Sequence, residues 1–240
     1  MRRFFSNPLT LLLLVVMAFQ TITSGRFESP LEWLKITLMI LPGILIGLTL
    51  HEFSHAFVAY RLGDPTPKQQ GRVTINPLAH IDPVGMIALL FIGFGWGRPV
   101  EINPAYFRKR RRDEFLVAIA GVTMNFILAV IFMAALGLLI RSGSDFLRTD
   151  PGVIVMYVLS QIVAINLVLM IFNLLPIPPL DGFTILTEIF NLRHTQFYRQ
   201  VYDKGFLLLI LLILFNITGR VLSPAVGFLY QLLAKIFIGV

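Results

Sequence analysis

The sequence predicts an all-α polytopic membrane protein with about six transmembrane or re-entrant helices and a small re-entrant β-hairpin. Hydrophobic residues make up 56% of the 240 residues and charged residues only 14%, with a mean hydropathy of +0.80. A soluble domain of this size would not stay dissolved with that composition. Several apolar runs are long enough to cross about 30 Å of hydrocarbon. The Lys and Arg residues gather in particular connections between these runs, as orientation signals do.

Four of the apolar runs are predicted to be membrane helices. The first, Leu9–Thr23, follows a basic N-terminus and is either a short spanning helix or a signal peptide. No small-x-small cleavage site follows it, which favours a retained helix. The runs Leu34–Tyr60, Phe115–Ile140 and Val153–Leu175 are each long enough to span, and we expect three transmembrane helices there.

The remaining apolar runs are less regular. Pro83–Gly97 is glycine-rich and too short to span, so it is either a re-entrant hairpin packed on the helices or an interfacial loop. Gly205–Ile217 and Val221–Val240 are separated by polar residues, and the second contains Pro224. They are expected to be short spans or a helical hairpin. We predict a single integral membrane domain over residues 1–240, with its core at about 34–182 and a C-terminal helical hairpin at about 204–240.

The positive charge indicates orientation rather than a nucleic-acid partner. The net charge is +7 and the pI near 10.1. Of the 20 Lys and Arg residues, 14 lie in the N-terminus and in two connections, 61–114 and 181–204, and five lie on the opposite side. The positive-inside rule therefore places these three segments in the cytoplasm. The run Arg108–Arg112 is interpreted as an anchor at anionic headgroups.

The polar motif H-E-x-x-H lies inside the apolar run Leu34–Tyr60, at His51, Glu52 and His55. Two histidines four residues apart share one face of a helix and could bind one zinc ion. In water-exposed metalloproteases the glutamate of this motif takes a proton from the attacking water. An acidic residue in a membrane helix costs about 2.5–3.5 kcal/mol on insertion scales, which favours a function for Glu52 over a chance match. Cysteine is absent, so thiolate catalysis and sulfur ligands are excluded.

A second polar motif ends the run Val153–Leu175. Three prolines within residues 176–179 cannot continue a helix, so Asp181 is expected to lie on extended backbone, with a turn at Gly182. Taken alone, this is a helix stop followed by an ordinary turn. Depth favours a functional interpretation, because His51 and Asn173 lie roughly 25 and 30 Å from the outer ends of their helices at 1.5 Å per residue. Asp181 could then complete a His₂-carboxylate site with a fourth position open for water.

The two motifs together resemble those of the site-2 proteases, which are intramembrane zinc metalloproteases. H-E-x-x-H lies on one membrane helix, and N-x-x-P-x-x-x-L-D-G, residues 173–182, ends a later one. The likeness runs from about Leu34 to Gly182. One departure is the segment 121–125, where many relatives have proline after the glycine, so no role is assigned to Asn125. Three further matches lie in the connection between the motifs: Arg61-Leu62-Gly63-Asp64-Pro65, Asn76-Pro77-Leu78-Ala79-His80-Ile81-Asp82-Pro83 and Gly97-Arg98-Pro99-Val100.

The resemblance implies a three-helix catalytic core that holds one zinc ion through His51, His55 and Asp181, with Glu52 as general acid/base. The implied activity is hydrolysis of peptide bonds within or near transmembrane segments of membrane protein substrates, on the cytoplasmic side of the cell membrane. Asn173 either stabilises the oxyanion or holds substrate, or it bonds the backbone of its own helix. The chain resembles a minimal member, because no stretch is long enough for a PDZ or appended regulatory domain. The expected partners are a transmembrane segment and the lipid bilayer, with no nucleic acid.

Two other functions are compatible with these motifs: a membrane metal carrier or transporter, and an inactive protease-like binding protein. Transport would require polar groups strung across the membrane, whereas these groups gather at one depth. The intact Glu52 argues against an inactive relative. We also expect an unwound substrate segment to pair as an added strand with residues 85–103. His80 is expected to pack within its loop or to lie at the membrane interface rather than to bind a metal, and His194 is expected to be solvated.

Overall fold

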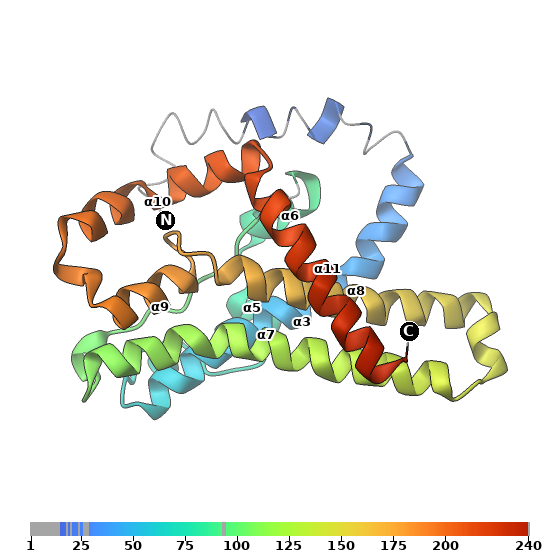
Figure 1. The fold of residues 1–240 in the computed structure, drawn as a ribbon, viewed down its shortest axis with the longest axis horizontal. Coiled ribbons are helices and arrows are strands. Elements are labelled where there is room, and N and C mark those ends of the chain that lie inside the picture. The colour runs from blue at the N-terminus through green and yellow to red at the C-terminus, as the bar shows by residue number, and fades with distance from the viewer. Residues whose placement is uncertain are drawn as a thin grey trace.

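The computed structural model describes residues 15–17, 19, 21–23, 25, 29–92 and 95–239, and it is built from helices (Figure 1). Three helices of the described residues are long and apolar enough to cross a membrane: α3 (Pro30–Arg61), α7 (Arg110–Arg141) and α8 (Asp150–Asn173). They coincide with the three predicted spans, and that prediction is confirmed. The predicted run Leu9–Thr23 lies largely outside the described residues.

Close packing of α3 on α8 depends on two glycines one turn apart. A Cβ atom at Gly43 would lie 2.8 Å from the side chain of Ile165, and one at Gly47 would lie 2.7 Å from Leu169. Small residues at this spacing let two membrane helices approach at backbone distance. Helix α7 runs beside α8, to which it is joined through the 3₁₀ turn η2 (Asp145–Arg148), and it also packs on α3 (Figure 1).

The connection between α3 and α7 differs from the prediction. It contains α4 (Thr66–Gln69), α5 (Pro77–His80), α6 (Pro83–Ile92) and the 3₁₀ turn η1 (Pro104–Tyr106). The predicted β-hairpin is not confirmed by the described part of this connection, 62–92 and 95–109. Among the described residues the β pairing consists of one antiparallel bridge, between Ile81 and Gly97. Helix forms in the first arm because proline suits a first helical position and Met, Ala and Leu, which follow it, are strong helix formers.

Residues 95–103 follow as an extended segment that is tied to the rest of the connection. The N–H of Arg98 donates to the carbonyl of His80 at 2.7 Å, and the N–H of Asn103 donates to the carboxylate of Asp64 at 2.7 Å. Both acceptor residues are fully buried. His80 also donates from Nε2 to the carbonyl of Thr74 at 2.7 Å, so it packs within its loop as predicted. These contacts fix the position of the extended segment beside α3.

The C-terminal part contains α9 (Asp181–Phe190), the 3₁₀ turn η3 (Leu192–His194), α10 (Gln196–Leu214) and α11 (Ile217–Phe237). Helices α10 and α11 meet at a 74° bend and could form one broken span. The polar residues predicted to separate two C-terminal runs lie instead inside α11, which also continues through Pro224. The described residues therefore give three spans, or four with the bent pair, and the predicted total of about six is not confirmed.

Candidate metal centre and active site

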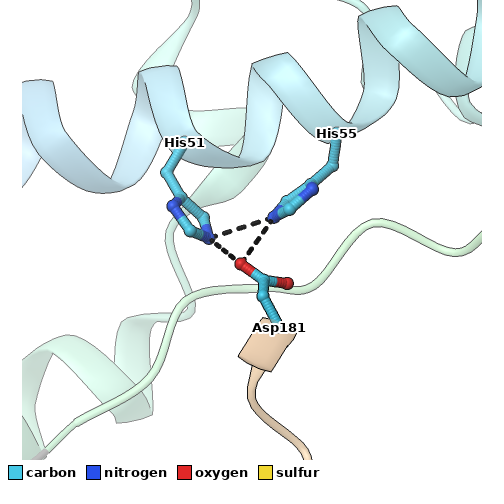
Figure 2. Close-up of side chains that lie close together, drawn as sticks. All are labelled: His51, His55 and Asp181. Atoms are coloured by element: carbon cyan, nitrogen blue, oxygen red, sulfur yellow. Dashed lines mark hydrogen bonds and ion pairs between the residues drawn. The ribbon is translucent and has the colours of Figure 1, made fainter. Parts of the chain in front are cut away.

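Helix α3 presents His51 and His55 on one face, and the first residue of α9, Asp181, meets them from a distant part of the chain (Figure 2). The two Nε2 atoms are 3.0 Å apart. Oδ2 of Asp181 is 3.2 Å from Nε2 of His51 and 3.3 Å from Nε2 of His55. The structure thus brings together three of the residues predicted from the sequence. It corrects the expected backbone, because Asp181 begins helix α9 rather than lying on extended backbone.

Hydrogen bonds on the far side of each ring fix which nitrogen faces Asp181. Nδ1 of His55 is 2.7 Å from the carbonyl oxygen of Val117, so Nδ1 carries the proton and donates it. Nδ1 of His51 is 2.7 Å from Oδ1 of Asn125, whose own amide donates elsewhere. In a neutral ring the other nitrogen, Nε2, is then the one with the free lone pair, and both Nε2 atoms face Asp181. Outer partners of this kind orient the histidines of metal sites and raise their basicity.

The Asn125 side chain joins three helices at the level of the histidines. Its Nδ2 donates to the carbonyl of Gly47 on α3 at 3.2 Å and to Oδ1 of Asn166 on α8 at 3.0 Å. Asn166 in turn donates to the carbonyl of Ile162 at 2.8 Å. Both asparagines are fully buried. In a medium without water each of these polar groups must be satisfied within the protein, and here they are satisfied across the helix interfaces.

The imidazole rings of His51 and His55 pack directly against Gly121, which has no side chain to exclude them. A Cβ atom at this position of α7 would lie 2.5 Å from Nε2 of His55 and 2.6 Å from Cε1 of His51. Gly121 and Asn125 are four residues apart and share one face of α7, so this face receives the rings and also orients one of them.

The three converging ligand atoms fit a divalent cation. Oδ2 of Asp181 is buried and has no hydrogen-bond donor among the described residues, and it faces two imidazole lone pairs. Lone pairs this close repel one another unless a cation or a proton lies between them. Tetrahedral zinc with bonds of about 2.0–2.2 Å places its ligands roughly 3.3–3.6 Å apart, close to the separations observed. The histidine and carboxylate donors suit zinc, and the set of three leaves a fourth position open.

Glu52 lies beside this centre and is held by the extended segment 95–103. Its Oε2 accepts the N–H of Val100 at 3.0 Å. This segment is held in turn by Arg72, whose side chain donates to the carbonyls of Arg98 and Pro99, the latter at 2.8 Å. Arg72 is only 4% exposed. Burial lowers the pKa of Arg72 from its ordinary value, but a guanidinium stays charged at neutral pH. The orientation of Glu52 therefore depends on a buried cation in a distant loop.

Asn173 lies at the end of α8 beside His51 and Glu52. Its Nδ2 donates to the carbonyl of Leu169 in its own helix at 2.9 Å, which is one of the two alternatives expected for it. Its side chain also lines the space in front of Glu52.

Two cavities meet at the centre. A polar cavity of about 390 Å³ extends past His55 and Asp181 and is also lined by Glu114, Thr184 and Tyr202. An apolar cavity of about 360 Å³ extends the other way and is lined mainly by Leu48, Trp96, Leu169, Phe172, Leu180 and Phe206. Five residues belong to both walls: His51, Glu52, Pro99, Asn173 and Pro179.

A group of charged residues fixes α9, and therefore Asp181, against α7. Arg193 pairs with Glu114 of α7 and with Glu188 of α9, the latter at 2.7 Å, and both carboxylates are buried. Burial alone would lower the pKa of Arg193, but the two carboxylates outweigh it and raise that pKa. Arg111, interpreted from the sequence as part of a headgroup anchor, donates to carbonyls at the end of α9. His194 is exposed, as predicted.

The sequence interpretation missed four contributors to the site: Gly121, Asn125, the carbonyl of Val117 and Arg72. A signal existed for Asn125, since an asparagine within an apolar run is costly unless it has a polar partner. Its i, i+4 spacing from Gly121 placed both on one face. No sequence pattern indicated the carbonyl of Val117 or the side chain of Arg72, because a carbonyl has no sequence signature and Arg72 lies in an irregular loop.

Several known proteins are similar to this chain. The model of Peptidase family M50 matches residues 148–215. "Putative zinc metalloprotease YwhC" of Bacillus subtilis is 37% identical over 209 residues, covering 87% of this chain and 92% of that protein. "Putative zinc metalloprotease Rip2" of Mycobacterium tuberculosis is 33% identical over 199 residues, covering 80% of this chain and 72% of that protein. "Cation/H(+) antiporter 19" of Arabidopsis thaliana is 30% identical over 160 residues, but only 18% of its length is covered.

No solved structure matches the chain. The two metalloprotease relatives each match most of it, and His51, His55 and Asp181 form a group that could hold a metal ion. The chain therefore belongs to peptidase family M50, the site-2 protease family of integral membrane proteins, and is a zinc metalloprotease.

Proposed function

We propose that this protein cuts peptide bonds within or near transmembrane segments of other membrane proteins, with one zinc ion held by His51, His55 and Asp181. The observation that carries the proposal is the meeting of these three ligand atoms within 3.3 Å of one another, two of them on the membrane helix α3 and the third on α9. Glu52 lies beside them at the junction of the two cavities. A centre at this position can act on a chain that never leaves the membrane.

Each polar group around the centre has a proposed part in the reaction. Zinc, when bound, supplies a Lewis acid and lowers the pKa of a coordinated water to about 7. Glu52 takes the proton from the attacking water and returns it to the leaving amine. The N–H of Val100 holds Glu52 in place for both steps. Asn173 holds the substrate backbone or its developing oxyanion after its amide leaves the carbonyl of Leu169.

The two rival functions fit the structure less well. A carrier needs a series of polar sites through the membrane, whereas the possible metal ligands found among the described residues, His51, His55 and Asp181, form a single group. A binding protein without activity would not need a carboxylate held in front of an open metal position. The location of the cavities also supports a single integral membrane domain in which residues of the core 34–182 and of α10 share one site.

Replacement of Glu52 tests the proposal. Purified protein in detergent is assayed for zinc content and for cutting of model transmembrane segments. Glu52→Gln should keep one zinc per chain and lose cutting by about 10²–10⁴-fold, the range attributed to general acid–base catalysis. Asp181→Asn should lose both zinc and activity. Cutting by Glu52→Gln at the wild-type rate would refute the assignment, and a carrier or scaffold would keep its function in this variant.

The proposed orientation places the polar cavity toward the cytoplasm of the cell. It rests on the excess of Lys and Arg in the connections 61–114 and 181–204. The chain has no cysteine, so single cysteines can be introduced as reporters. In intact cells, Ser144→Cys should react with an impermeant thiol reagent and His194→Cys should not. The opposite pattern would reverse the orientation.

A further inference from the structure

The two cavities divide the centre into an apolar and a polar side. Toward the N-terminal parts of α3 and α8, the apolar cavity is walled by Leu48, one turn before Glu52, and by Leu169, one turn before Asn173. Toward the other end of α3, the polar cavity is walled by His55, one turn after His51, and by Glu114. The character of the lining therefore changes at the level of Glu52.

We propose that the apolar cavity is the binding pocket for the side chain of the substrate residue on the membrane side of the cleaved bond. The polar cavity receives the backbone on the other side of that bond. This inference rests on the proposed function and adds a substrate preference to it: a large aliphatic or aromatic residue is required at this one position. Leu48, Leu169 and Phe206 determine the preference because their side chains form the wall.

The reacting groups themselves show that the pocket serves a substrate side chain. His51, Glu52 and Asn173 belong to its wall, so a side chain in the pocket belongs to a residue whose backbone lies at the centre. A lipid chain in the same place would block the position that the attacking water needs. The cavity of about 360 Å³ has room for a leucine or phenylalanine side chain, and its lining offers few partners to water.

Size discrimination should follow the behaviour of other apolar enzyme pockets. One missing methylene in such a pocket changes kcat/KM by roughly 10–200-fold. Replacing leucine by alanine in the substrate removes more than that, so a fall of at least about tenfold is expected. An aspartate would lie against mainly apolar side chains and near the carboxylate of Glu52, and it should stop cutting at this bond.

The test uses the full-length zinc-loaded protein in detergent and a panel of model transmembrane segments. Mass spectrometry identifies the cleaved bond, and the residue on its membrane side is then varied through Ala, Leu, Phe and Asp. The wild type should prefer Leu and Phe over Ala by at least about tenfold, and it should not cut the Asp segment at this bond. Equal rates for Ala and Leu would overturn the inference.

Variants of Leu48 test the wall directly. Leu48→Trp fills the pocket and should shift the preference toward Ala, whereas Leu48→Ala enlarges it and should allow Trp in the substrate. The matched control is Leu50→Trp, on the same helix but outside the cavity wall, which should keep the wild-type preference. Unchanged preference in folded, zinc-loaded Leu48→Ala would overturn the inference even if Leu48→Trp does not fold. Failure of the zinc-loaded wild type to cut any segment would instead refute the proposed function itself.

Discussion

The glycine at position 121 offers a sharp test of the metal centre. In Gly121→Ala the new methyl group would lie 2.5 Å from Nε2 of His55, which is about 0.9 Å short of the 3.4 Å at which ordinary contact begins. It would lie 2.6 Å from Cε1 of His51. Metal–ligand bonds tolerate about 0.2 Å of displacement. The rings cannot yield without cost, because the carbonyl of Val117 and the amide of Asn125 hold their far sides.

The fold should survive the same change. Alanine is favoured over glycine within a helix by about 1 kcal/mol, while overpacking of a filled interior costs about 1–3 kcal/mol. The net cost is therefore about 0–2 kcal/mol, so the thermal unfolding midpoint should fall by no more than several degrees. Zinc affinity should fall steeply, because the displacement required of the ligand atoms is several times what the bonds tolerate. The expected result is a folded protein with little zinc and no cutting activity.

The assay is zinc content per chain, measured together with thermal unfolding on the same preparation. The matched control is Gly227→Ala in α11, where an added Cβ meets no atom within 4 Å. This control should keep one zinc per chain and full activity. A Gly121→Ala protein that keeps stoichiometric zinc with wild-type affinity would refute the geometry on which the metal centre rests.

Three further perturbations address the residues around the centre. Asn125→Leu removes the acceptor of His51, and competition with a chelator should show zinc affinity lower by about 10–100-fold. Arg72→Met releases the segment that holds Glu52, and turnover should fall by about 10–100-fold with zinc content unchanged, since misplacement by about 1 Å costs about 10²-fold. Burial lowers the pKa of His80, so it folds in the neutral form. Its contribution to stability should be complete above its unfolded pKa of about 6.5 and should be lost as the pH falls toward the lower folded-state pKa, which unfolding midpoints would detect.

Each of these predictions has its own control. Tyr230→Phe removes a hydrogen bond to Ser160 away from the centre and should leave zinc affinity unchanged. Arg98→Met replaces an exposed arginine in the same connection as Arg72 and should leave turnover unchanged. His194→Gln alters an exposed histidine and should leave the pH dependence unchanged. Each prediction would be contradicted if its variant and its control gave the same zinc affinity, turnover or pH dependence of unfolding, respectively.

The three long helices were predictable because lipid leaves the backbone few alternatives. A chain without water around it must satisfy its polar groups internally, so a long apolar run becomes a helix. The ends were less predictable. Helix α7 begins five residues before the predicted run Phe115–Ile140. Hydropathy did not predict this first turn, because its residues are charged. The helix α6 was not predicted for a related reason, since the glycines of residues 83–97 favour a hairpin while the Met, Ala and Leu residues between them favour a helix.

The metal centre was predictable in part. The spacing of His51 and His55 fixes their relation on any helix, whatever surrounds it. The approach of Asp181 depends on how α9 packs against α7, and that packing rests on Arg111 and on Arg193 with its two carboxylates. Such tertiary contacts have no local pattern. For the same reason the residues that orient the histidines and Glu52 could be found only with the chain folded.

The amide of Asn125 also limits how the enzyme can move. It bonds a carbonyl of α3 and a side chain of α8, so three helices meet in one polar junction. Sliding any of them by a single residue means a shift of 1.5 Å, enough to break both bonds where no solvent can replace them. We therefore expect α3, α7 and α8 to travel as one rigid body. A substrate can then enter, and its fragments can leave, only by movement of the surrounding elements. The metal ligands His51 and His55 keep their positions relative to α7 and α8 throughout the catalytic cycle.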